Sequence, residues 1–254
     1  ALRNASWHVS DILTEINTNK DRREGFSDVF TIQTPVAKNR IDLGTEIQAS
    51  SEIKKIAQAF GASLVGITSY DKRWEYSNKF SDMSLKSHPP EIPKTLKNVI
   101  VIAQPMDYDL IKTVPSALSG SATGMGYSHD ALTVLSLTQY IRNLGYDAIG
   151  SMNDTSLAIP YAIKAGLGEY GRNGLLITKK FGPRVRLGKI YTNLNLKHDK
   201  PIKLGVKEFC NICNLCAKGC PVRAIPKGSP SAKTYNISNI SGVKKWSVDG
   251  EKCF

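Results

Sequence analysis

The chain has 254 residues, a hydrophobic share of 41%, and 34 Lys and Arg against 22 Asp and Glu, so that its formal charge is +12. This composition excludes a disordered or fibrous protein, and the length suits one large α/β domain with an appendage or two modest domains. The sequence contains no run of about 18 apolar residues, so we expect no membrane-spanning helix in it.

The first predicted elements lie between residues 50 and 103. Residues 1–49 are polar and weakly patterned, and they are predicted to be an N-terminal extension with at most a helical turn or two at 11–16. Apolar residues at helical spacing then predict a helix that ends at Gly61: Ile53, Ile56, Ala57 and Phe60. Residues 64–67 and 97–103 are predicted to be buried strands.

A long helix is predicted in the middle of the chain. Residues 115–127 are rich in Ser and Gly and lead into it, and Gly145 ends it. Its apolar stripe consists of Leu137, Tyr140, Ile141 and Leu144. Residues 146–149 predict a strand, residues 160–165 predict a helix, and residues 166–196 are dense in glycine and basic residues. This order of elements favours an α/β (α+β) fold with a mixed sheet.

Four of the five cysteines lie within eleven residues, at Cys210, Cys213, Cys216 and Cys220, and Pro221 follows them. This C-x2-C-x2-C-x3-C-P spacing is that of a bacterial ferredoxin [4Fe–4S] motif, whose fourth cysteine commonly ligates a second cluster. Zinc is the alternative, but a zinc ribbon needs two separated pairs. A disulfide framework would spread its cysteines along the chain. The spacing therefore predicts an iron–sulfur segment.

Cys253, the second-last residue, leaves two interpretations open. Either the chain holds one cluster on its four neighbouring cysteines, or it is a fragment cut within a second cluster motif that begins at Cys253. The ferredoxin pattern favours the fragment. A free terminal thiol is the simpler reading of the same residue.

An iron–sulfur cluster moves single electrons, so we expect residues 50–196 to hold the group that receives them. Flavin, cobamide and haem are the candidate acceptors. The sequence has no Cys-x-x-Cys-His motif, no Gly-x-Gly-x-x-Gly after a predicted strand and no Gly-x4-Gly-Lys-Ser/Thr motif. Its four histidines show no metal-ligand spacing.

Residues 165–178 read AGLGEYGRNGLLIT, and residues 180–187 read KFGPRVRL. These stretches resemble the corrinoid-binding core of respiratory reductive dehalogenases. Residues 61–67 and 73–77 resemble the segment before that core in the same family, residues 200–210 resemble its lead into the first cluster, and residues 246–253 resemble the start of its second cluster motif. The likeness covers roughly residues 50–254.

The resemblance implies a nitroreductase-like core that binds a base-off cobamide, at residues 50–204, and a ferredoxin-like [4Fe–4S] segment, incomplete, at residues 205–254. Intact family members carry two clusters, of which this chain has one complete motif. Electrons would pass through the clusters to cobalt, and the reaction would be reductive dehalogenation of an organohalide. The implied cluster ligands are Cys210, Cys213, Cys216, Cys220 and Cys253.

The resemblance also implies site residues. Tyr127 matches a proton donor that precedes the long helix, Arg186 its supporting arginine, and Asn153 a polar pocket residue. A phenol can donate a proton if a cation stabilises the phenolate, although each residue alone has an ordinary structural explanation. The implied cobamide contacts are Gly168, Arg172, Asn173, Leu175, Thr178, Lys180 and Arg184. Three aromatic residues either line the halide pocket or fill the core: Trp74, Tyr76 and Trp246.

The implied partners are a small organohalide, a low-potential electron donor and a small membrane anchor protein, with no nucleic acid. The implied location is the outer face of the cytoplasmic membrane, membrane-associated after twin-arginine export. The identity of the organohalide, the cobamide type and the oligomeric state stay open, with a homodimer as one option.

Two alternatives remain. Epoxyqueuosine reductase, a cytoplasmic enzyme, uses the same cofactors on tRNA, and the charge of +12 favours such a partner. That family has Gly-Arg-Asp-Tyr where residues 124–128 read Gly-Met-Gly-Tyr-Ser, and Gly-Lys-Asn-Thr where residues 171–174 read Gly-Arg-Asn-Gly. An acid at the donor position suits tRNA chemistry, and Tyr127 does not provide it. The second alternative is a cobamide-binding or electron-transfer module without turnover.

Overall fold

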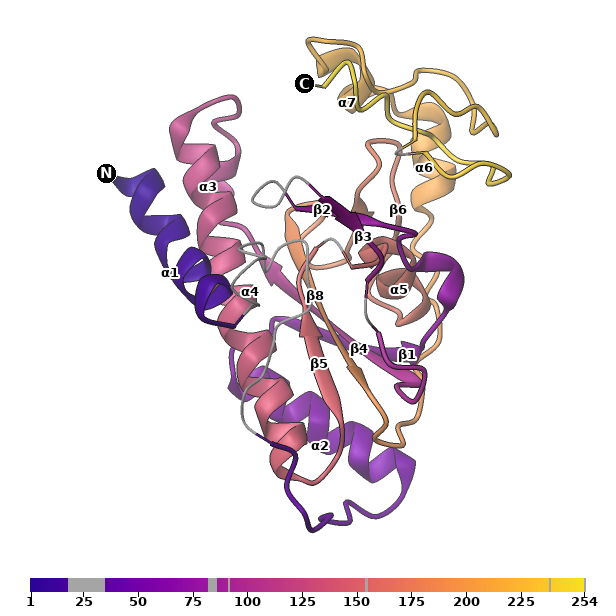
Figure 1. Cartoon of the computed structure of the whole chain (residues 1–254). Helices are drawn as coiled ribbons and strands as arrows, with labels where there is room; N and C mark the ends of the chain where they lie inside the picture. The colour runs from indigo at the N-terminus through magenta and orange to yellow at the C-terminus, as the bar shows by residue number, and fades with distance from the viewer. Residues whose placement is uncertain (18–34, 82–85, 91, 154, 238, 254) are drawn as a thin grey trace. The chain divides into compact units, whose positions relative to one another are not determined.

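The computed structural model describes residues 1–17, 35–81, 86–90, 92–153, 155–237 and 239–253 (Figure 1). The chain divides into two units. The first consists of residues 1–167 and 184–200, and the second of residues 168–183 and 201–254. Residues 168–183, which the sequence prediction assigned to the core, group here with the cysteine-bearing segment.

A four-stranded sheet organises the first unit (Figure 1). Its order is β1 (Leu64–Ser69), β4 (Asn98–Pro105), β8 (Val185–Thr192) and β5 (Ala148–Ser151). All three pairings are antiparallel, so the prediction of a mixed sheet is wrong. The reason is the unpredicted strand β8, which lies between β4 and β5 and whose Arg186 and Lys189 interrupt the apolar pattern expected of a central strand. The three predicted strands and the mixed helix and strand content are confirmed.

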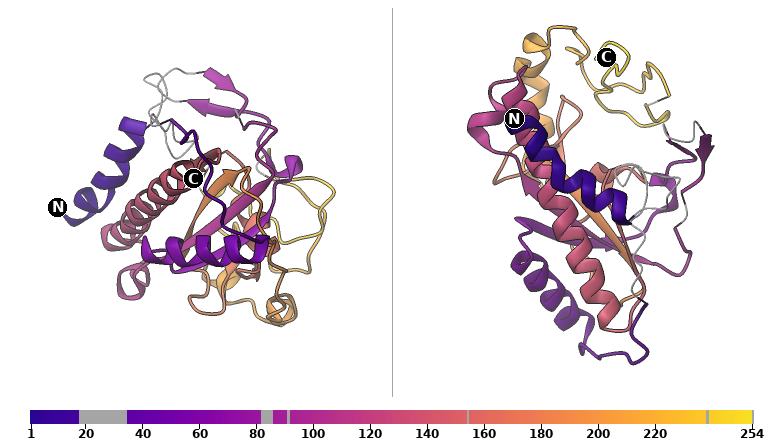
Figure 2. Two further views of the ribbon diagram at one scale, coloured as in Figure 1. Left: turned by 90° about the horizontal axis from the view of Figure 1, so that it is seen from below. Right: turned by 60° about the vertical axis from the view of Figure 1, so that its left-hand side comes forward.

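Helices cover both faces of this sheet. α2 (Glu46–Ala59) and α4 (Ala117–Asn143) pack on one face, where they form the main apolar core with Ile67, Ile100, Ile102 and Ile190. α5 (Ala158–Lys164) packs against the sheet as well, and its Tyr161 lies beside Tyr191, which points away from that core. α1 (Leu2–Asn17), longer than the one or two turns predicted, lies along α4 (Figure 2).

Caps and glycines set the ends of the two long helices. Thr45 and Ser116 each form a capping box with the residue three positions later, so both helices begin earlier than predicted. Gly145 follows α4 with φ +88°, and a Cβ atom there would lie 2.6 Å from the carbonyl oxygen of Asn39. Only glycine meets both conditions, which confirms the predicted end of the helix.

Short elements complete the first unit: η1 (Lys72–Trp74), α3 (Tyr108–Ile111), and the hairpin of β2 (Lys79–Ser81) and β3 (Lys86–His88). The second unit contains the antiparallel pair β6 (Glu169–Tyr170) and β7 (Leu176–Ile177), followed by α6 (Val206–Ile212) and α7 (Leu215–Gly219). Among the described helices, none has both the length and the apolar character needed to cross a bilayer.

Candidate functional site

The phenol of Tyr127 lies at the centre of the candidate site in the first unit. Asn153 Nδ2 donates a hydrogen bond to its oxygen over 2.5 Å, and Arg186 Nη1 donates another over 3.0 Å. The guanidinium carbon of Arg186 is 5.0 Å from the centre of the phenol ring. The structure therefore brings together the three residues predicted to be catalytic. Tyr127 lies within α4 and not ahead of it, because the capping box at Ser116 starts the helix earlier than predicted.

Two glycines before Tyr127 make room for its neighbours. A Cβ atom at Gly126 would lie 2.8 Å from Cγ of Arg186, and one at Gly124 would lie 2.5 Å from the indole ring of Trp7. The Trp7 ring packs 5.3 Å from the Tyr127 ring, centre to centre. Each glycine thus admits a side chain that contacts the phenol.

Helix α1 covers Tyr127, which is only 7% exposed. Trp7 and two hydrogen bonds hold α1 against α4. The Ser128 hydroxyl donates to the carbonyl of Ser6 over 2.8 Å and accepts a bond from the amide of Ser10 over 3.2 Å. The sequence prediction missed this contribution, because the N-terminal segment has only a weak apolar pattern.

Asp130, three residues after Tyr127 in α4, is a second residue that the prediction missed. Its side chain is fully buried, and neither carboxyl oxygen has a hydrogen-bond partner among the residues that the structure describes. It packs against Gly188, where a Cβ atom would lie 2.6 Å from one carboxyl oxygen. Burial raises the pKa of Asp130 to about 7, although the charges of Lys189 and Arg186 act to lower it. The charge of Asp130 therefore acts on Arg186, which donates a hydrogen bond to the Tyr127 hydroxyl.

The raised pKa of Asp130 makes the free energy of unfolding depend on pH. Between its ordinary pKa of 3.8 and about 7, the folded chain holds a proton that the unfolded chain has released. The free energy of unfolding should therefore fall as the pH rises through this range. Asp130→Asn cannot ionise, so we expect a smaller fall between pH 4 and pH 7, measured by urea unfolding at several pH values. Equal slopes in the two proteins would contradict this assignment.

Lys189 positions the segment that carries Asn153. Its side chain is fully buried, and Nζ donates to the carbonyl oxygens of Met152, Asn153 and Ser156 over 2.7, 3.1 and 3.2 Å. Three carbonyl groups converge on one ammonium group, which fixes the turn from which Asn153 reaches Tyr127. The prediction noted Lys189 only as one of many basic residues.

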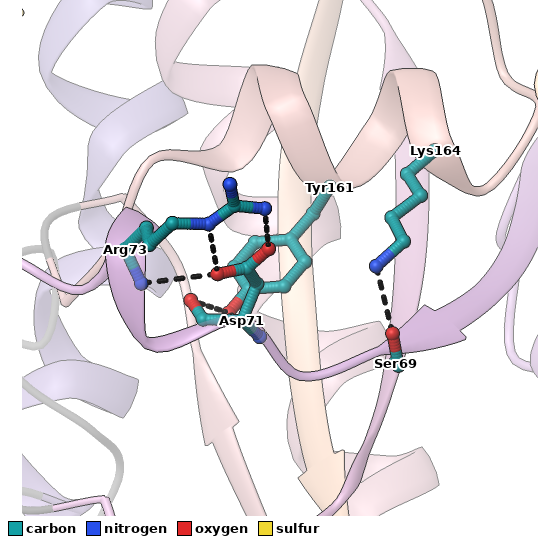
Figure 3. Close-up of polar contacts among 5 residues, drawn as sticks. All are labelled: Ser69, Asp71, Arg73, Tyr161 and Lys164. Atoms are coloured by element: carbon teal, nitrogen blue, oxygen red, sulfur yellow. Dashed lines mark hydrogen bonds and ion pairs between the residues drawn. The ribbon is translucent and has the colours of Figure 1, made fainter.

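The segment after β1 is held by polar contacts with α5 (Figure 3). The hydroxyl of Tyr161 donates to the carbonyl of Asp71, and the Asp71 carboxylate accepts two hydrogen bonds from the Arg73 guanidinium, over 2.9 and 2.6 Å. These bonds lower the pKa of the Asp71 carboxyl. The Trp74 ring packs edge-on against Tyr161 at 4.7 Å, and Lys164 Nζ lies 5.4 Å from its centre. Trp74 therefore packs against α5.

The residues predicted to bind a cobamide fall in both units. Arg184 belongs to the first, where its Nη1 donates to the carbonyl of Met106 over 2.7 Å. Six belong to the second: Gly168, Arg172, Asn173, Leu175, Thr178 and Lys180. Leu175 and Lys180 are exposed, whereas the Thr178 hydroxyl is buried and closes a turn by accepting from the amide of Phe181.

Arg172 differs from the other five because it is 1% exposed and hydrogen-bonded from all three guanidinium nitrogens. Its partners are the backbone carbonyls of Cys210, Cys213, Pro226 and Gly228. Trp246, predicted either to line the halide pocket or to fill the core, is buried against this guanidinium. These contacts place Arg172 within the cysteine segment, and its predicted contact with a cobamide stays a prediction.

The four clustered cysteines sit on and beside α6 and α7, and all are free, partly buried thiols. Cys220 Sγ accepts a hydrogen bond from the amide of Ala224 over 3.3 Å, and this bond is the main cause that lowers its pKa. Burial raises the pKa of Cys216, against the positive charge of Arg172. Thiols with amide donors and a buried cation nearby are suitable cluster ligands.

In the described residues, the side chains of these cysteines do not surround a common metal site. In the part of the chain that the structure describes, no group of three or more His, Cys, Asp or Glu side chains is positioned to hold a metal ion. Cys253 is exposed. Four clustered free thiols nevertheless have the donor chemistry that an iron–sulfur cluster requires.

Known proteins provide a separate comparison. No model of a known protein family matches the sequence. The chain is similar to the tetrachloroethene reductive dehalogenase of Desulfitobacterium hafniense, with 39% identity over 244 residues that cover 81% of this chain and 44% of that protein. It is less similar to an epoxyqueuosine reductase of Staphylococcus aureus, with 26% identity over 80% of this chain and 59% of that protein.

A solved structure resembles the fold. The catabolic reductive dehalogenase NpRdhA matches with a TM-score of 0.78 and 22% identity over 99% of this chain and 34% of that one. The likeness agrees with the predicted fold class. By either comparison, the chain spans less than half the length of the dehalogenases that it matches.

Proposed function

The chain belongs to the reductive dehalogenase family, and from this premise we propose that it acts in the reductive dehalogenation of a small organohalide, with Tyr127 as the proton donor. The reaction replaces a carbon–halogen bond with a carbon–hydrogen bond, so it consumes two electrons and one proton and releases halide. The observation that carries the proposal is the pair of N–H donors, from Asn153 and Arg186, that face one phenol oxygen.

The two donors suit proton transfer from Tyr127. When the hydroxyl gives its proton to the carbon that loses halide, negative charge remains on the phenol oxygen. The charged Arg186 and the amide of Asn153 would stabilise that charge through the hydrogen bonds that they already make. Burial under α1 keeps water from competing for these bonds.

We propose that Cys210, Cys213, Cys216 and Cys220 ligate iron–sulfur, with Cys253 as a ligand of a second cluster, and that the core binds a base-off cobamide. When bound, the cobamide would supply the electron-rich metal for carbon–halogen cleavage and the clusters the single electrons. Within the described part of the chain, Arg186 Nε is buried without a hydrogen-bond partner, so it is available to an acceptor beside Tyr127.

The proposal includes a low-potential electron donor, a small membrane anchor protein as partner, and a place at the outer face of the cytoplasmic membrane. Cell fractionation with an antibody against this chain tests the location. Recovery in the cytoplasmic fraction alone would contradict that part of the proposal.

Reconstitution of the full chain tests the function. The protein is loaded with iron, sulfide and cobamide, reduced with methyl viologen, and assayed for chloride release from tetrachloroethene, the compound that names the relatives. We expect release that depends on the cobamide. Roughly four iron atoms per chain would indicate one [4Fe–4S] cluster and roughly eight would indicate two.

The same preparation distinguishes the alternatives. Turnover of epoxyqueuosine tRNA without release of chloride from any of a panel of organohalides would favour the tRNA-modifying enzyme. Binding of both cofactors with no turnover of either substrate would favour an electron-transfer module. Each result contradicts the proposed dehalogenation.

A further inference from the structure

Arg172 connects two separate parts of the cysteine segment. Its Nε and Nη2 donate to the carbonyl of Cys210 over 3.1 and 2.5 Å, and Nε also donates to Cys213 over 3.2 Å. Its Nη1 donates to the carbonyls of Pro226 and Gly228, each over 2.8 Å. One side chain therefore ties the start of the cysteine run to the loop that follows its end.

The position of Arg172 is itself fixed from several directions. The Trp246 ring lies 4.8 Å from the guanidinium carbon, and its Nε1 donates to the same Gly228 carbonyl over 2.9 Å. Nearby, the Tyr170 hydroxyl donates to the carbonyl of Trp246 over 2.9 Å. A guanidinium that is buried with all three nitrogens bonded is held in one orientation, which its planar fork makes specific to arginine.

A buried cation has an electrostatic consequence for neighbouring thiolates. The Arg172 guanidinium donates to the carbonyls of Cys210 and Cys213, so its charge is fixed beside the backbone that carries two of the four thiols. Water does not screen this charge, because Arg172 is 1% exposed. Reduction adds a negative charge to an iron–sulfur cluster, so a fixed positive charge beside the ligands favours the reduced form.

We propose that Arg172 is a positioning residue of the iron–sulfur segment, which preforms the loops around the four cysteines and raises the reduction potential of the cluster that they hold. The inference rests on the proposed iron–sulfur site. It does not depend on the substrate, because neither part requires turnover.

The first experiment measures the loops in the full chain without iron. Hydrogen exchange is followed in peptides that span residues 205–228, which include the Cys213 amide bonded to the carbonyl of Phe209 over 2.9 Å. Arg172→Gln removes the charge and most donors, and Arg172→Lys keeps the charge but cannot reach four carbonyls at once. We expect exchange roughly 10- to 100-fold faster in both variants. The control is Lys227→Gln, which removes an exposed charge from the same loop and should exchange like wild type.

The second experiment measures the loaded protein. Iron content, the rate of iron loss to a chelator and the midpoint potential are compared in the same four proteins. We expect Arg172→Gln to lose iron roughly tenfold faster and to show a more negative midpoint potential. Arg172→Lys should lose iron faster but keep a midpoint near that of wild type, because its charge remains.

The outcomes distinguish the role of Arg172 in preforming the loops from the effect of its charge on the reduction potential. Wild-type exchange in both Arg172 variants would overturn the role in preforming the loops, and an unchanged midpoint in Arg172→Gln would overturn the role of the charge. A wild-type chain that binds no iron would contradict the proposed function and the electrostatic role together, whereas the exchange data would still decide the role in the loops.

Discussion

Tyr127→Phe is expected to lower the rate of dehalogenation roughly 100- to 10,000-fold while leaving iron and cobamide content unchanged. The substitution removes the hydroxyl that donates the proton and keeps the ring that packs against Trp7. The Asn153 and Arg186 donors lose their common acceptor, but neither belongs to the cysteine segment. Chloride release at saturating tetrachloroethene, normalised to bound cofactor, measures the effect.

Tyr140→Phe is the matched control, because Tyr140 lies in the same helix and its hydroxyl donates a hydrogen bond to the Glu52 carboxylate over 3.4 Å. We expect its rate to stay within about twofold of wild type. A Tyr127→Phe protein that retains the wild-type rate would remove Tyr127 from the chemistry. A loss of cofactor together with rate would instead indicate a structural role.

Lys189→Met is expected to lower the free energy of unfolding by about 2–4 kcal/mol. The methionine keeps an unbranched side chain, one atom shorter, but leaves the buried carbonyls of Met152, Asn153 and Ser156 without their shared donor. It also removes a positive charge that acts on the buried Asp130. Because the turn that carries Asn153 loses its anchor, the dehalogenation rate should fall as well.

Lys54→Met provides the comparison for this prediction. Lys54 pairs with Asp199 at 2.5 Å, and both side chains are about one-third exposed. An ion pair of this kind contributes at most about 1 kcal/mol. Urea unfolding of both variants at one pH measures the difference. Equal losses of stability would show that the three carbonyls do not depend on Lys189.

Helical elements could be predicted from the sequence where local signals agreed. The helix that ends before Gly61 has an apolar stripe and a glycine with φ +103°, and both features are readable in one short window. Strand β8 could not be predicted in this way. Lys189 is fully buried and Arg186 is partly buried, against the general rule that Arg and Lys are exposed, and only the completed sheet shows what satisfies them.

The candidate site shows a similar division. Asn153 and Arg186 stand 26 and 59 residues from Tyr127, so their meeting depends on the topology of the sheet and was expected only from the family resemblance. Asp130 and Lys189 carry no motif, and their importance follows from burial, which sequence patterning does not report. The segment that contains Arg172 was recognised by its family resemblance. The partners of the guanidinium could not be predicted, because they are backbone carbonyls, which every residue type carries.

The alternation of side chains along β8 restricts how this protein can evolve. Arg186 and Gly188 face α4, whereas Lys189 faces the carbonyls of Met152, Asn153 and Ser156. Loss or gain of one residue within the strand would exchange these faces and separate Arg186 from Tyr127. The spacing from Arg186 to Lys189 therefore has to be inherited unchanged.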